Sequence, residues 1–232
     1  MNFEQDLGGL VYESDSQIIQ SIRVLEEYNL TSALSIGMLK PPAYWSWYVK
    51  RHSPEGKFKF ASMADYYAAF KALENQFYGN GPQAEDIIRI SSGLVDHLKS
   101  RICTSTNIGL ANPEKQIKCI RHNYDFELDK APTNTLRYAS IPKGKILLEE
   151  ALDNADYARY LRAIFNTNDQ VNEIIRTLSF FSRIPSNKIT HAAHAISEEK
   201  TLAAHMSIVG NELQVSLLSP CEEGRAMGVK AK

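Results

Sequence analysis

The feature that most constrains the fold is the recurrence of apolar residues at helical spacing along much of the chain. The clearest case begins at Ser62, which with Asp65 three residues later resembles a capping box. Its apolar stripe consists of Met63, Tyr66, Tyr67, Phe70, Leu73 and Phe77. Similar spacing predicts further helices over residues 16–29, 31–40, 82–102, 145–153, 154–166, 169–182 and 187–208.

Strand-like alternation is confined to shorter segments. Residues 115–141 are the main candidate, because Ile117, Cys119 and Arg121 alternate with their neighbours and residues 135–141 are placed to pair with them. The run from Lys57 to Phe60 and residues 213–218 alternate in the same way. Residues 103–113 are typical of a loop, and residues 219–232 of a mobile tail.

These patterns predict a mainly α fold. We expect two helical lobes, over residues 14–102 and 145–218, around a small β element, with a mixed α+β fold as the alternative. A weak division is conceivable near residues 103–144, but no flexible linker marks it. The prediction is therefore a single domain over residues 1–232.

Composition excludes several classes of protein. The chain has 232 residues, 44% hydrophobic and 23% charged, which is typical of a globular protein able to bury a core. A net charge of −1 argues against a nucleic-acid clamp over the whole surface but leaves local basic patches open. The three cysteines form no CxxC pair. The acidic N-terminus predicts no signal peptide and no window is apolar enough to span a membrane, so we expect a cytoplasmic protein without a membrane partner.

The most unusual composition lies at residues 40–60, which hold both tryptophans and five basic residues against one acid. The candidate binding residues there are Tyr44, Trp45, Trp47, Lys50, Arg51, Lys57 and Lys59. Aromatic rings stack on bases and cations neutralise phosphate, a combination that suits single-stranded nucleic acid. The same residue types dominate protein–protein hot spots. An ordinary core corner with a charged edge is the third interpretation.

A second basic cluster consists of Lys115, Lys118 and Arg121, with His122 and Cys119 among them. Positive neighbours would lower the pKa of an accessible thiol, whereas a buried strand cysteine would be inert. This cluster gains significance if it meets the segment at residues 40–60 in space.

Three histidines, His191, His194 and His205, raise the hypothesis of a metal site. If residues 187–208 form one helix, His191 and His194 share a face. His205 then lies about 16 Å beyond His194 along the axis, at 1.5 Å per residue. One helix cannot deliver all three to one ion, so only His191 and His194 remain as weak metal candidates.

Familiar catalytic signatures are absent: the sequence has no GxGxxG after a strand, no GxxxxGK[ST], no HExxH and no GxSxG. We therefore expect a non-enzymatic interaction or assembly protein without a cofactor, of the coat, nucleocapsid or complex-subunit type. Its partners would be proteins, including copies of itself, with single-stranded nucleic acid as a further partner. The alternatives are a dedicated single-stranded nucleic-acid-binding protein and a metal-assisted enzyme using His191 and His194.

Overall fold

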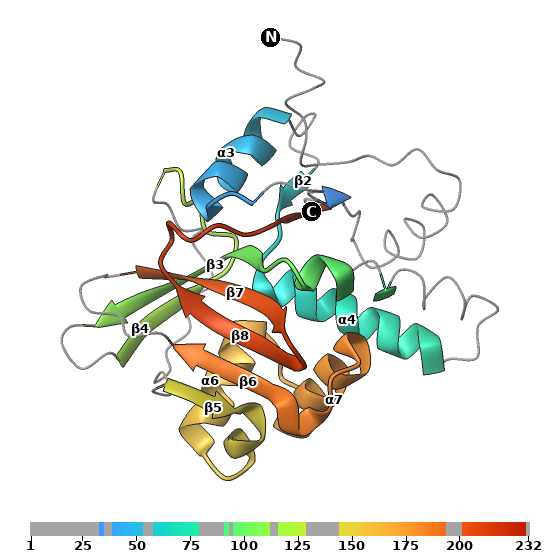
Figure 1. The fold of residues 1–232 in the computed structure, drawn as a ribbon. Coiled ribbons are helices and arrows are strands. Elements are labelled where there is room, and N and C mark those ends of the chain that lie inside the picture. The colour runs from blue at the N-terminus through green and yellow to red at the C-terminus, as the bar shows by residue number, and fades with distance from the viewer. Residues whose placement is uncertain are drawn as a thin grey trace.

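A six-stranded mixed sheet forms the centre of the molecule (Figure 1). The computed structural model describes residues 33–34, 39–52, 58–78, 91–92, 95–111, 116–128, 144–193 and 201–230. In spatial order the strands are β4 (Gln116–Arg121), β3 (Ile102–Ala111), β7 (Thr201–Val209), β8 (Glu212–Leu218), β6 (Ile189–Ala193) and β5 (Gly144–Leu147). Only β6 and β8 are parallel; the other neighbours in this sheet are antiparallel.

The hairpin between β7 and β8 sets the register of these two neighbouring strands. Val209 faces Glu212 across a two-residue loop of Gly210 and Asn211. Gly210 has a φ of +61°, whereas Asn211 is not among the residues with positive φ. Glycine at the first loop position is typical of a type II′ turn, whose twist matches that of the flanking strands.

Three helices cover one face of this sheet: α4 (Met63–Tyr78), α6 (Ala155–Phe165) and α7 (Val171–Ser182), as Figure 1 shows. Their apolar sides and the facing strand residues form one large core. Local signals begin the helices. Asp65 accepts a hydrogen bond from the backbone N of Ser62 at 2.8 Å, and the side chain of Asn154 caps α6. Two 3-10 turns, η2 (Leu148–Leu152) and η3 (Ser186–Lys188), connect strands to helices.

The edge of the sheet near β3 carries a second layer. It consists of α3 (Pro42–His52) and a three-stranded sheet in the order β1 (Ala33–Leu34), β9 (Met227–Lys230) and β2 (Phe58–Phe60). Residues 219–226, which we call the strap, run between the two layers (Figure 1). Arg225 pairs with the start of β3: its O accepts from Cys103 N at 2.8 Å, and its N donates to Arg101 O at 2.9 Å. Gly224 pairs with Lys40, just before α3.

The prediction of a mainly α protein with two helical lobes is wrong, because the fold is mixed α+β around the six-stranded sheet. Residues 103–111 of the expected loop belong to β3, and the helix expected over residues 187–208 is replaced in the described residues by η3, β6 and β7. Strand β7 is buried along most of its length, between β3 and β8, so buried side chains occur on both of its faces. Period-2 alternation is lost in such a strand, and its alanines imitate a helix.

Several local predictions are confirmed. The helices expected over 62–78, 154–166 and 169–182 correspond to α4, α6 and α7, and the alternating runs at 58–60, 116–121 and 213–218 lie in β2, β4 and β8. Two further predictions are wrong: residues 227–230 of the expected mobile tail form β9, and residues 33–34 of the expected helix over 31–40 form β1. The predicted helix at 16–29 and the strand at 135–141 lie outside the described residues.

The single domain over 1–232 stays a prediction. Strands β3 and β4, inside the suggested boundary region, belong to the same sheet as β7. Among the described residues, no helix combines the length and the apolar character that crossing a bilayer demands.

Candidate binding surface around helix α3

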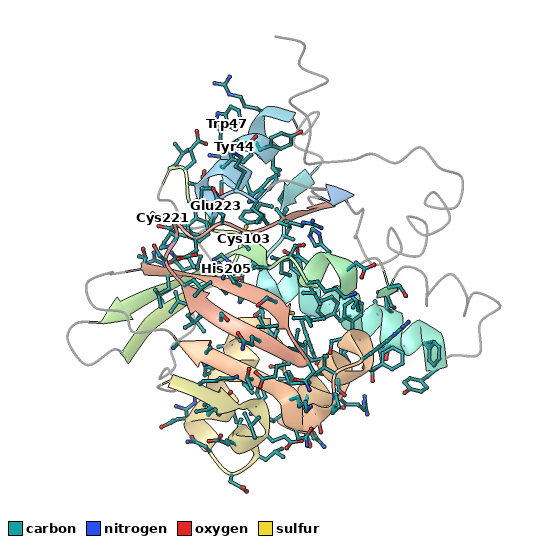
Figure 2. All side chains as sticks on the ribbon, in the orientation of Figure 1. Tyr44, Trp47, Cys103, His205, Cys221 and Glu223 are labelled. Atoms are coloured by element: carbon teal, nitrogen blue, oxygen red, sulfur yellow. The ribbon has the colours of Figure 1, made fainter. Side chains whose placement is uncertain are left out.

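Helix α3 presents two different faces. It starts with Pro42 in its first turn, where a missing backbone N–H costs nothing. Trp45, Tyr48 and Val49 point into a small core, with exposed fractions of 0%, 2% and 7%. Tyr44 and Trp47 are only partly buried, and Figure 2 shows them on the outer part of the molecule. The helix therefore separates the predicted aromatic residues into a core set and a surface set.

Trp45 is an anchor of the fold. Its indole Nε1 donates a 2.8 Å hydrogen bond to the carbonyl O of Gly224 in the strap. Gly224 also exchanges backbone hydrogen bonds with Lys40 in both directions. A side chain at position 224 would put its Cβ 2.8 Å from the backbone N of Cys103, so only glycine lets the strap lie this close. Trp45 is therefore not placed to stack on a base.

The outer side of α3 forms a cation–aromatic stripe. Lys40, Tyr44, Trp47 and Arg51 follow each other at intervals of three or four residues. The Nζ of Lys40 lies 5.5 Å from the ring centre of Tyr44, and the guanidinium carbon of Arg51 lies 5.6 Å from that of Trp47. The two aromatic rings are 5.5 Å apart. Each cation is thus within range of a cation–π interaction.

The other two basic residues that the structure describes in this segment, Lys50 and Lys59, lie beside carboxylates. Lys50 forms ion pairs with Asp125 at 2.5 Å and Glu127 at 2.7 Å. Burial alone would lower the pKa of Lys50, but hydrogen bonds and charge from both carboxylates raise it above its usual value. Lys59 lies 3.4 Å from a carboxylate oxygen of Asp65. In contrast, the ion pairs of the described residues include neither Lys40 nor Arg51.

The segment that follows β4 lies directly beside α3 and β2. Lys59 Nζ donates to Asn123 Oδ1 at 2.9 Å, and Phe126 N donates to Ser46 Oγ at 3.3 Å. Arg121, from the second predicted cluster, lies with its guanidinium 5.8 Å from the ring of Tyr124. Tyr124 lines a pocket together with Lys50 and Lys59, so its ring lies between Arg121 and the first cluster. Lys118 is on β4, whereas Lys57 and Lys115 lie outside the described residues.

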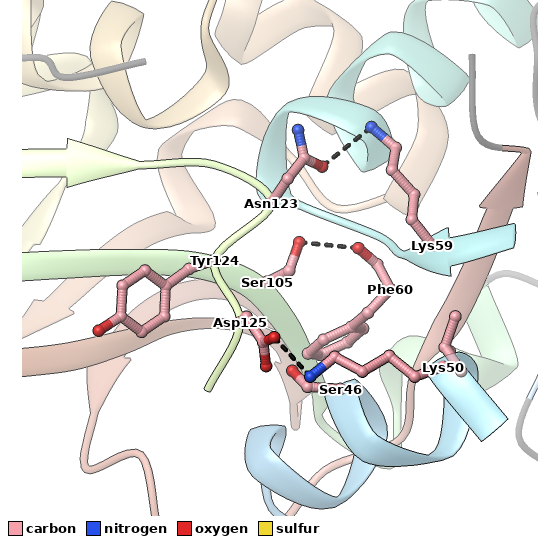
Figure 3. Close-up of a pocket in the computed structure, with 9 residues that line it drawn as sticks. Ser46, Lys50, Lys59, Phe60, Ser105, Asn123, Tyr124 and Asp125 are labelled. Carbon is pink, nitrogen blue, oxygen red and sulfur yellow. Dashed lines mark hydrogen bonds and ion pairs between the residues drawn. The ribbon is translucent and has the colours of Figure 1, made fainter. Parts of the chain in front are cut away.

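Between these elements lies a pocket of about 320 Å³, shown in Figure 3. Residues from α3, β2, β3 and the segment after β4 line it: Ser46, Val49, Lys50, Lys59, Phe60, Ser105, Asn123, Tyr124 and Asp125. The sequence interpretation missed Ser105, Asn123 and Asp125. A signal existed, since Asn and Asp directly after a strand favour a turn. Asn123 indeed adopts a positive φ of 57° and Asp125 accepts two backbone hydrogen bonds.

The histidines do not form a metal site in the described residues. His191 is buried on β6, where its Nε2 and the hydroxyl of Tyr160 are hydrogen-bonded at 2.6 Å. His205 is buried on β7 and pairs with Ser216 of β8. Ser216 in turn pairs with Ala192 of β6 and not with His191, so the two histidines are not in register across the sheet. His194 lies outside the described residues. Within the described ranges no group of three potential ligand residues is close enough to hold an ion.

Comparisons with known proteins do not indicate a function for this chain. Comparison with protein-family models, curated proteins and solved structures found no match. Any function must therefore be inferred from the chemistry of the surface.

Proposed function

We propose that this chain is a non-enzymatic assembly protein that associates with copies of itself through the outer side of α3. The proposal rests on one observation, the stripe of Lys40, Tyr44, Trp47 and Arg51. Aromatic residues and arginine together are the residue types that dominate the centres of protein interfaces.

An acidic group beside the stripe supports self-association over other partners. The backbone pairing of Lys40 with Gly224 places the neighbouring residue Glu223 at the start of α3 (Figure 2). Glu223 is exposed, and so is Leu39 at 45%. We define the α3 face as Leu39, Lys40, Tyr44, Trp47, Arg51 and Glu223. A twofold axis would let cations of one copy meet the carboxylate of the other, because an isologous interface is self-complementary.

Single-stranded nucleic acid fits the described part of this surface less well. Trp45 is fully buried, and Lys50 is held by two carboxylates. A phosphate backbone that reached Lys50 would also meet Asp125 and Glu127, whose charges would repel it. On the described part of this surface, few cations remain that could neutralise phosphates and so release the counterions of a nucleic acid. The proposed function therefore predicts that assembly depends only weakly on nucleic acid.

The test is sedimentation velocity of the purified protein over a range of concentrations, with and without nuclease. We expect a concentration-dependent oligomer that nuclease leaves intact. Trp47→Ala should weaken association by about tenfold or more, as for hot-spot residues. Tyr78→Ala is the matched control, because Tyr78 is an exposed aromatic on α4 at 65% exposure. A monomer at all concentrations, or an assembly that nuclease dissolves, would contradict the proposal.

A charge swap sharpens the test. Arg51→Glu and Glu223→Arg should each weaken association, and the double variant should recover most of the loss if the two residues meet across the interface. Arg159→Glu is the control, since Arg159 is exposed on α6 and pairs locally with Asp156 at 3.3 Å.

A further inference from the structure

The pocket beside α3 carries more hydrogen-bonding capacity than the protein itself uses. An ammonium group has three donors. The Nζ of Lys59 contacts two acceptors, Asn123 Oδ1 and Asp65 Oδ1, which leaves one donor. Lys50 likewise contacts two acceptors, Asp125 and Glu127. The amide nitrogen of the exposed Asn123 adds donors beside Lys59. The mouth of the pocket therefore offers donors that a ligand with acceptor oxygens would satisfy.

The charges around the pocket limit which anion it can take. Two ammonium groups, of Lys50 and Lys59, face three carboxylates, of Asp125, Glu127 and Asp65. A dianion such as phosphate would meet net repulsion from this set. A ligand that brings one carboxylate together with one ammonium group adds no net charge and pairs with both signs.

The two ammonium groups lie at different ends of the pocket, each beside its own acceptors. Figure 3 shows Lys59 with Asn123 at one end and Asp125 with Lys50 and Ser46 at the other, with Ser105 and Phe60 between them. Oδ2 of Asp125 accepts from Lys50 and retains capacity for a second donor. Ser105, which is 1% exposed, donates its hydroxyl to Phe60 O at 2.7 Å and so presents an acceptor oxygen.

The floor between the two ends is apolar. Phe60 and Val49 are 5% and 7% exposed and both line the pocket. A volume of about 320 Å³ is at the lower end of the range for ligand sites, which favours a small molecule. A polar pair at each end and an apolar floor suit a ligand with two opposite charges and a hydrophobic side chain.

We propose that this pocket binds a free α-amino acid with an apolar side chain. Its carboxylate lies at Lys59 and Asn123, its ammonium group at Asp125, and its side chain against Phe60 and Val49. The site is independent of the proposed self-association, because its residues belong to the other side of α3 from Tyr44, Trp47 and Arg51.

Calorimetric titration of the full-length protein tests this ligand class. L-phenylalanine is the probe, compared with 3-phenylpropionate, which lacks the ammonium group, with phenethylamine, which lacks the carboxylate, and with inorganic phosphate. We expect saturable binding of the amino acid and affinities about tenfold or more lower for each truncated compound, because each loses a charge-assisted contact. Equal binding of 3-phenylpropionate or of phosphate, or no binding of the amino acid at millimolar concentration, overturns the proposal.

Two variants assign the ends of the ligand. Lys59→Gln should weaken L-phenylalanine and 3-phenylpropionate alike, whereas Asp125→Asn should weaken L-phenylalanine and leave 3-phenylpropionate unchanged. Lys145→Gln is the control, since Lys145 pairs with Glu212 far from the pocket. Amide chemical shifts of Ser105 and Asn123 in the unmodified protein must also change on titration; if they do not, the proposal fails whatever the variants show.

Discussion

The two faces of the central sheet differ in chemistry. One row of paired residues crosses the sheet toward the helices: Ile102, Met206, Val215, His191 and Ile146. The adjacent row, one residue along each strand, points the opposite way: Cys103, His205, Ser216, Ala192 and Lys145. The first row belongs to or borders the large apolar core, whereas the residues of the second row are small or polar, and Cys103 among them contacts the strap.

The two faces therefore contribute differently to the stability of the protein. The helix face buries aliphatic and aromatic side chains, and its contribution to the free energy of folding comes mainly from removing apolar surface from water. The strap pairs with the start of β3 through backbone hydrogen bonds, and Trp45 of α3 donates to the strap. The second face holds buried polar atoms for which the described residues supply no partner, among them both ring nitrogens of His205. Stability therefore resides mostly on the helix face, and the candidate binding surface lies beyond the start of β3.

The largest expected effect is on the helix face. Phe181 is fully buried and stacks on Phe70 with ring centres 3.8 Å apart. Phe181→Ala should lower the free energy of unfolding by about 3–5 kcal/mol, because it removes apolar contacts and leaves a cavity. Urea denaturation measures this loss. Leu152→Ala, at a position 57% exposed, is the control and should change the value by less than about 0.5 kcal/mol. A similar loss in both variants would refute the assignment of stability to this core.

A second prediction separates the histidines of the two faces by pH. Burial, together with the charge of Arg101, lowers the pKa of His205 to about 3, and burial lowers that of His191 to about 3. Each stays neutral when folded but takes up a proton when unfolded below its ordinary value of 6.5. The stabilisation is complete above pH 6.5 and is lost as the pH falls toward 3, at about 1.4 kcal/mol per pH unit for each histidine.

Leucine variants test this at neutral and acid pH by urea denaturation. His205→Leu should remove its share of the pH dependence and raise stability at neutral pH, because it removes two buried nitrogens to which no described residue is hydrogen-bonded. His191→Leu should remove the same share but cost about 1–3 kcal/mol, since the hydroxyl of Tyr160 loses its partner. Equal losses at neutral pH would show that the two faces treat a buried histidine alike.

The smallest expected effect concerns the joint between α3 and the sheet. Trp45→Phe keeps an aromatic ring but loses the hydrogen bond to Gly224, whose carbonyl still accepts from Lys40. The cost should be about 1 kcal/mol. Amide hydrogen exchange should become faster in α3 and stay unchanged in α6, because the opening is local. Faster exchange in both helices would mean that the two layers unfold together.

Sequence patterns were sufficient where an element has one buried side. Helices α4, α6 and α7 have an apolar stripe against the sheet and a polar outer side, so their period is visible. Strand β3 was missed because Thr104, Ser105 and Thr106 are polar and yet buried. Each finds a specific partner: Thr104 donates to Ala204 O, Ser105 to Phe60 O, and Thr106 contacts His122. A local sequence pattern does not predict hydrogen-bond partners that lie far away in the chain.

The sequence indicated only part of the candidate site, because some of its residues come from distant segments. The composition of residues 40–60 indicated a binding segment, and α3 with its cation–aromatic stripe lies there. The neutralisation of Lys50 by Asp125 and Glu127 was not visible, because these carboxylates are more than seventy residues away. A local count of charges cannot include such partners.

The sequence by itself determined the helices with one buried side and the unusual composition of residues 40–60. These depend only on the spacing and the kinds of residues that are close in the chain. Only the tertiary structure decided that β6 and β7 are strands, that Trp45 belongs to a core while Trp47 does not, and that Asn123 and Asp125 complete a pocket. These outcomes depend on which distant segments meet, because burial on both faces and long-range ion pairs leave no periodic trace in the chain.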